Sequence, residues 1–324
     1  MKLTQHPREV RRTGDNRAAS SLWGYVWRMS EGHQVALCLI AVFVAMLSLI
    51  PIELQRRIVN EIVATQNVPL LLQFGAIYVG VILLHQAVKY GLWAYQSWIS
   101  ESTSLYTRRH LLGLVRQRDG EPEHGNGRVV SIAVSEVESL GGFVGQAVSG
   151  ACANAAMLLG VIVYMFVVEP LIAAFALAFL IPQIALTPVI QRRLNRLVEA
   201  RVGFLRDLGD DISDRATTAE PQWRTLLDQI YSNRVRFFLL KFLMKSALNL
   251  LNASGPITVL LLGGYLVMQG EAEVGVIVAF ISGFERISSP LRELIGFYRI
   301  AAQANVQHDL IADWIDTRLD RSKD

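Results

Sequence analysis

The sequence predicts an all-α, polytopic membrane protein, and two observations carry this prediction. First, six apolar runs divide the 324-residue chain, and five of them carry no charge over 19 residues or more. A helix rises 1.5 Å per residue, so about 20 residues cross a hydrocarbon core of about 30 Å. Second, 29 of the 31 Lys and Arg residues fall in alternate polar segments between the runs. This asymmetry is typical of a chain that crosses a membrane repeatedly.

The charge distribution also predicts the orientation of each span. The apolar runs cover residues 34–52, 68–88, 140–168, 170–191, 246–270 and 274–284. The polar segments before, between and after them hold 6, 2, 6, 0, 11, 0 and 6 Lys and Arg residues. Basic residues are retained on the cytoplasmic side, so both termini and the second and fourth loops are predicted to be cytoplasmic. We expect the protein to lie in the plasma membrane, which in a bacterium is the inner membrane.

The sixth run has only 11 uncharged residues, which is too short for a span. The loop before it has no Lys or Arg and the tail after it is basic, so the topology requires a sixth crossing. We therefore expect the helix to continue past the run into charged sequence. Helical spacing then predicts an apolar stripe on one face, made of Phe284, Ile287, Leu291, Leu294 and Tyr298.

The two long loops, residues 89–139 and 192–245, hold 51 and 54 residues. Apolar residues recur in them at helical spacing, which predicts that each loop is a pair of helical arms. The arms extend the flanking spans by roughly 20 residues, or about 30 Å. Gly120 and Pro122 mark the tip of the first loop, and Pro221 marks the tip of the second.

The chain before the first span is predicted to contain an amphipathic helix. Trp23 and Trp27 are one helical turn apart beside Leu22 and Val26, and such tryptophans favour the headgroup region of a membrane. The alternative is an early start to the first span. The predicted organisation is an N-terminal cytoplasmic segment at 1–32, a membrane domain at 33–316 and a cytoplasmic tail at 317–324.

Composition argues against several other classes. The net charge of +3 is mild, and basic residues are interleaved with acidic ones, so we expect no nucleic-acid partner. None of the five lysines follows a glycine, so the chain has no phosphate-binding loop, and it has no Gly-x-Ser-x-Gly motif. The histidines show no metal-ligand spacing. Cys38 and Cys152 lie in apolar runs and are predicted to be small buried hydrophobic residues, with no disulfide or metal pair.

Two short stretches resemble the transmembrane domain of ABC exporters. The first is Gly263-Gly264-Tyr265-Leu266-Val267, followed by Gly270, Gly275, Ala279-Phe280 and Pro290-Leu291, and the second is Ser135-Glu136-Val137-Glu138. The resemblance extends over roughly residues 20–316. Close packing of helices would explain the glycines equally well.

The resemblance implies a permease subunit that works by alternating access, as a homodimer or a heterodimer with a similar subunit. Because the sequence has no phosphate-binding loop, we expect no enzyme activity and no cofactor on this chain, with ATP on a separate nucleotide-binding subunit. That subunit would dock on the two loop tips, whose coupling candidates are Glu121, Glu123, His124, Thr218, Glu220 and Gln222.

Polar residues inside the spans are candidates for a substrate pathway, because such groups are costly in lipid. They are His85, Lys89, Asn154, Asn252, Glu285 and Arg286. Each also has a structural explanation. Lys89 can anchor a helix end at the headgroups, the asparagines can link helices, and Glu285 and Arg286 can be paired within the bundle.

Three alternatives remain open at this point. The first is a proton-driven transporter without an ATPase, similar to the SbmA/BacA peptide-uptake family, with protons carried on Glu285 or Glu53. The second is a membrane regulator that transports nothing. The third is a piece of a longer exporter, since the family-like sequence continues through Trp314, close to the end at Asp324.

Overall fold

The computed structural model describes residues 6–8, 10, 18–63, 67–116, 136–213 and 223–320. Of these residues 92% are helical, and none of them lies in a strand. Six helical stretches are long and apolar enough to cross a membrane: Gly32–Glu61, Val68–Leu114, Val137–Val168, Pro170–Gly209, Arg224–Met268 and Val274–Thr317. The prediction of an all-α, multi-pass membrane protein is confirmed.

Several helices are much longer than a membrane is thick. α4 (Val68–Arg116) has 49 residues, α9 (Leu180–Ser213) has 34, and α10 (Trp223–Met268) has 46. At 1.5 Å per residue α4 is about 74 Å long. The predicted helical arms are therefore confirmed for α4, α9 and α10. The returning arm of the first long loop, and both predicted loop tips, lie outside the described residues.

The chain forms two compact units. The first contains Met1–Tyr164 and Arg286–Asp324, and the second contains Met165–Glu285. Besides α4, the first unit holds α1 (Leu22–Ser30), α2 (Gly32–Leu47), α3 (Ile50–Arg57), η1 (Ile58–Val63), α6 (Val137–Gly142), η3 (Phe143–Ala147), most of α7 (Val148–Val168) and α12 (Ser288–Asp320). Besides α9 and α10, the second holds α8 (Pro170–Ala178) and α11 (Val274–Glu285).

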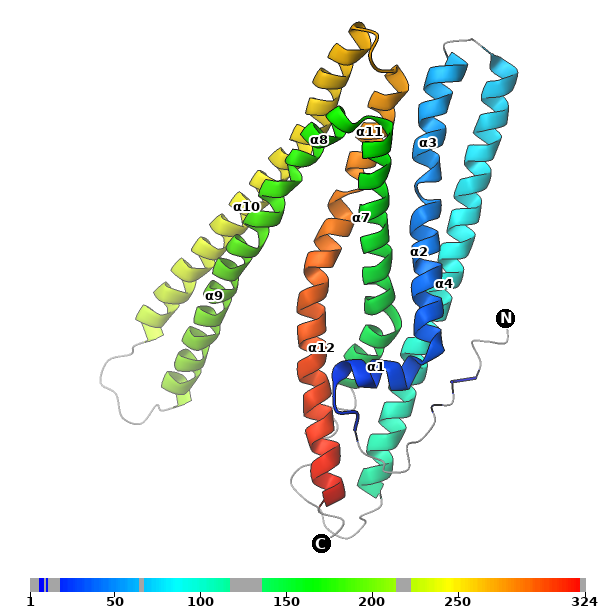
Figure 1. Ribbon diagram of the computed structural model, residues 1–324. Helices are drawn as coiled ribbons and strands as arrows, with labels where there is room; N and C mark the ends of the chain where they lie inside the picture. Colours follow the sequence, from blue (N-terminus) through cyan, green and yellow to red (C-terminus); the bar gives the residue numbers. More distant parts are fainter. Residues whose placement is uncertain are drawn as a thin grey trace. The chain divides into compact units, whose positions relative to one another are not determined.

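α1 is a separate helix and not an early start of the first span. Ser21 caps it, because its side chain accepts a hydrogen bond from the Gly24 amide. Glu31 then adopts a φ of 44°, which breaks the helix before α2 begins, so that α1 lies across the end of α2 (Figure 1). Trp23 and Trp27 are exposed on α1, whereas Leu22 and Val26 are buried. The predicted amphipathic helix is confirmed.

Proline explains three interruptions of the spans. A proline lacks the N–H that would bond to the carbonyl four residues earlier. α2 ends at Leu47, four residues before Pro51, and α8 ends at Ala178, four residues before Pro182. The third interruption separates α11 from α12 at residues 286–287, and Pro290 stands four residues after Arg286.

The segment between the first two apolar runs, residues 53–67, is largely helical. α3 and η1 continue the helix to Val63. The physical reason is that the charges at its start are paired along the helix itself. Glu53 accepts hydrogen bonds from Arg56 and Arg57, which are three and four residues further on.

In the first unit, two small residues on each side allow α4 to pack closely on α6 and η3. Gly141 lies against Ser104, and Gly145 lies against Ser100 and the Gln96 carbonyl. A Cβ atom added at Gly145 would come within 2.5 Å of the Gln96 oxygen. Glycine and serine spaced by four residues let helix backbones approach in membranes. The buried Gln96 side chain also donates a hydrogen bond to Ser149 Oγ at 2.8 Å.

In the second unit, α9 and α10 run side by side (Figure 1). α11 packs on α10 in the same unit. There the ring of Phe284 lies on Gly255, where an added Cβ would come within 2.2 Å of the ring. Gly263 packs similarly against Ile277. Phe284 is fully buried as a result.

The apolar stripe predicted across the sixth span is only partly correct. Phe284, Ile287 and Leu291 are buried, but Tyr298 is 81% exposed. Phe297 packs instead, with its ring 6.1 Å from that of Phe143. The predicted stripe assumed one continuous helix. The interruption at residues 286–287 starts α12 afresh, and its buried face then follows Phe297, Ala304 and Ile311.

Candidate functional site

The polar residues predicted for a substrate pathway divide between the two units. His85 and Lys89 on α4, Asn154 on α7, and Arg286 belong to the first unit. Asn252 on α10 and Glu285 at the end of α11 belong to the second. Glu285 is exposed, and Asn154 and Asn252 are half-buried. The coupling candidates Glu121, Glu123, His124, Thr218, Glu220 and Gln222 lie outside the described residues.

Arg286 lies at one interruption of the spans, between α11 and α12, and hydrogen-bonds to another, between α2 and α3. Its Nη1 donates a hydrogen bond of 2.8 Å to the Ser48 carbonyl, in the turn between α2 and α3. The amide of Ile52, the usual partner of that carbonyl in a helix, bonds to Leu49 instead. A cation on the carbonyls of a helix end is favourable, because those groups carry partial negative charge. Arg286 thus links the first span to the sixth.

Two of the charged pathway residues lie near a third. Lys89 and Arg286 are each close enough to His85 for their positive charges to act on its imidazole. The Lys89 ammonium also lies over the ring of Trp93, 4.9 Å from its centre. His85, Lys89 and Arg286 are all half-buried. The first unit therefore carries a basic group of side chains, His85, Lys89 and Arg286, within its spans.

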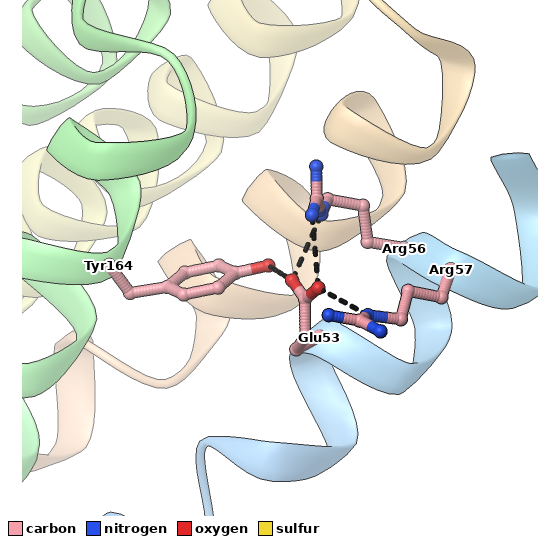
Figure 2. Close-up of polar contacts among 4 residues, drawn as sticks. All are labelled: Glu53, Arg56, Arg57 and Tyr164. Carbon is pink, nitrogen blue, oxygen red and sulfur yellow. Dashed lines mark hydrogen bonds and ion pairs between the residues drawn. The ribbon is translucent and has the colours of Figure 1, made fainter.

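A second polar cluster joins the first and third spans at the ends remote from α1 (Figure 2). Arg56 binds both oxygens of Glu53, with Nε and Nη2 each 2.9 Å away. Arg57 Nε donates at 2.8 Å, and the Tyr164 hydroxyl on α7 donates at 2.9 Å. The Glu53 carboxylate thus receives four hydrogen bonds, which a charged acceptor makes strongly.

This cluster includes a residue that sequence analysis missed. Tyr164 stands in a charge-free run and resembles an interfacial aromatic, so only the spacing of Glu53, Arg56 and Arg57 could have been noticed. Such spacing predicts ion pairs along one helix. It does not predict a partner 111 residues away on another helix.

The end of the first unit near α1 contains a third polar group of residues. The Tyr25 hydroxyl lies 2.8 Å from Thr107 Oγ1, and its ring packs edge-on against His308. Burial raises the pKa of Tyr25 to about 12, so the phenol is neutral. These residues, with Tyr106 and His110, line a small cavity between α1, α4 and α12. Neutral hydrogen bonding at this end ties α1 to the spans.

The segment before α1 is attached to the same end. The Arg8 guanidinium donates to the Met29 carbonyl at the end of α1 and pairs with Glu31 at 2.9 Å. The Arg8 backbone amide donates to Ser102 Oγ on α4. Only 8% of the Arg8 side chain is exposed. A buried arginine therefore caps α1 at the residue where the chain turns into α2.

The two cysteines, predicted to be small buried hydrophobic residues, are half-buried and in contact with each other. Cys38 on α2 and Cys152 on α7 place their sulfur atoms 3.2 Å apart, and both thiols are free. Among the described residues, no group of three or more His, Cys, Asp and Glu side chains could hold a metal ion.

No protein-family model matches the chain, and no curated protein matches it either. The chemistry of the described residues is ion pairing, hydrogen bonding and helix packing.

Proposed function

We propose that this chain is the transmembrane permease subunit of an ABC-type transporter. Two such subunits would enclose a path, and the substrate would cross by alternation between inward-open and outward-open arrangements. ATP would be hydrolysed by a nucleotide-binding subunit outside these 324 residues. The observation that carries the proposal is the length of the helices beyond what a bilayer requires.

α4, with 49 residues, and α10, with 46, exceed the roughly 20 residues of a span by more than twofold. The part of these long helices beyond a span is polar, and α9 shows the same pattern. It carries Arg192, Arg193 and Arg196 just after its apolar part, and further basic residues follow. Crossing the bilayer does not require such polar arms. A subunit docked on their tips would be connected rigidly to the spans through them. This supports coupling to an ATPase through the predicted tips.

The orientation belongs to the same proposal. The 29 to 2 distribution of Lys and Arg supports arms on the cytoplasmic side, where ATP is available. The basic group of His85, Lys89 and Arg286 supports a polar path through the first unit, because charges inside a membrane face partners or water. The substrate itself and the direction of transport are outside this proposal.

The proton-driven alternative is less well supported by the described residues. A proton carrier must release its partners when it is protonated. Glu53 is bound by two guanidinium groups and a phenol, so protonation would remove the negative charge that both arginines bind. Of the two proposed proton carriers this leaves Glu285, which is exposed.

The proposal is tested by purification in mild detergent from the native membrane. We expect a nucleotide-binding subunit to accompany the chain and to hydrolyse ATP. Replacing residues 119–127 by a Gly-Ser linker should remove both the subunit and the activity. The chain freed of other proteins should hydrolyse no ATP, because it has no phosphate-binding loop. Transport that persists without ATP and stops when a protonophore is added would instead support the proton-driven alternative.

A further inference from the structure

We propose that Cys38 and Cys152 form a redox modification site, in which a peroxide converts the two thiols into a disulfide between α2 and α7. The sulfur atoms are 3.2 Å apart, whereas a disulfide bond is about 2.05 Å long. Rotation of the side chains can close the remaining gap. Both residues are half-buried, so a small oxidant dissolved in the membrane can reach them.

The packing around the pair keeps the two helices in place for this reaction. Further along the same two spans, Ser48 Oγ lies 3.0 Å from Met157 Sδ, and Gly160 packs against Met46 and Leu49. The Glu53 to Tyr164 hydrogen bond closes the far end. The disulfide would therefore join surfaces that already face each other along their length.

The geometry gives the two thiols equivalent positions, because each sulfur lies 3.2 Å from the other. Either thiol can therefore react first with the oxidant, and the other then closes the disulfide.

The chemistry balances with hydrogen peroxide as the oxidant. One of the two thiols loses its proton and attacks one peroxide oxygen, the O–O bond breaks, and a sulfenic acid forms while the departing hydroxide takes up that proton and leaves as water. The sulfur of the other cysteine then displaces the sulfenic oxygen, which departs as a second water with the proton of that second thiol. Two thiols and one peroxide give one disulfide and two waters.

The test counts free thiols, which is unambiguous because the chain has two cysteines. The purified protein in lipid nanodiscs is treated with hydrogen peroxide, denatured and reacted with a maleimide carrying polyethylene glycol. We expect two labels per chain before oxidation, none afterwards, and two again after dithiothreitol. Two labels after oxidation, or a disulfide between two chains on a non-reducing gel, would overturn the proposal.

Single variants test whether the reaction needs both thiols. Cys38→Ser and Cys152→Ser each leave one cysteine without the neighbour that closes the disulfide, so dimedone should trap a sulfenic acid in both variants and little in the parent protein. Equal trapping in the parent and in the single variants would count against the disulfide.

A displaced cysteine provides the matched control. Leu39 is 65% exposed and follows Cys38 on α2, so its side chain points about 100° away around the helix. The double variant Cys38→Ser, Leu39→Cys should keep two labels after the same treatment. Equal loss of labels in this variant would show unspecific oxidation of membrane thiols and would count against a site.

Discussion

At the scale of single residues, Arg286 has a structural partner that a pathway role does not require. Replacing it with Gln leaves the Ser48 carbonyl without a charged donor, which should lower the free energy of unfolding by about 1–3 kcal/mol. The measurement is thermal unfolding in detergent. Arg292→Gln, at an exposed position of α12, is the control and should unfold as the parent does.

The result also separates the two roles of Arg286 that the sequence left open. Unfolding unchanged in Arg286→Gln, together with lost transport, would assign this residue to the pathway and not to the helix link. Reduced stability with transport retained would make it purely structural. Within the described part of the chain Glu285 is exposed and makes no hydrogen bond comparable to that of Arg286, so Glu285→Gln is to be read through transport.

Tyr164 should stabilise the protein through a single hydroxyl. Tyr164→Phe removes the bond to Glu53 and keeps the ring, so we expect a loss of about 1 kcal/mol. Glu53→Gln should cost more, because it removes the carboxylate charge that both Arg56 and Arg57 bind. Tyr298→Phe is the control, since Tyr298 is 81% exposed. Equal stability of the Tyr164 variant and its control would contradict the importance of this cluster.

At the scale of helices, the contact of α4 with η3 depends on Gly145. An added methyl group would meet the Gln96 carbonyl at 2.5 Å, and backbone cannot move aside as a side chain can. Gly145→Ala should therefore destabilise the first unit by about 1–3 kcal/mol. Gly142→Ala is the matched control, because nothing lies within 4 Å of its added Cβ and alanine favours helix. A destabilised Gly142 variant with a normal Gly145 variant would reverse this account.

The helices themselves were largely predictable, because span length and charge are local properties of the chain. Charge-free runs predict five spans, the distribution of Lys and Arg requires the sixth, and helical spacing predicts the arms of α4, α9 and α10. The interruptions at Leu47, Ala178 and Arg286 each stand four residues before a proline. Pro188 and Pro256 lie inside the continuous helices α9 and α10, so proline alone does not predict where a span is interrupted.

The contacts between helices were not predictable. Cys38 and Cys152 are 114 residues apart, and Ser48 and Arg286 are 238 apart. A periodic pattern indicates which face of a helix is apolar, but every face of a membrane helix is apolar, so it does not identify the neighbour. Tyr164 illustrates this limit, since the same residue would serve equally well at a lipid headgroup.

At the scale of the whole molecule, the orientation is the most direct prediction. In a Cys38→Ser, Cys152→Ser background, cysteines placed at Gly125 and Thr218 should resist a membrane-impermeant maleimide in intact cells, and one at Ala272 should react. All three should react after permeabilisation. Labelling of the first two positions in intact cells would reverse the topology and remove the argument that the arms meet a cytoplasmic ATPase.

The paired helices α9 and α10 can act as a lever. α10 is about 69 Å long, so a tilt of 10° about one end would move the other by about 12 Å. Because α9 lies along α10, the pair resists bending better than one helix alone. A small rearrangement among the apolar side chains at one end would become a displacement the width of a helix at the other. A small movement at one end of the pair can be enlarged at the other in this way without a hinge between them.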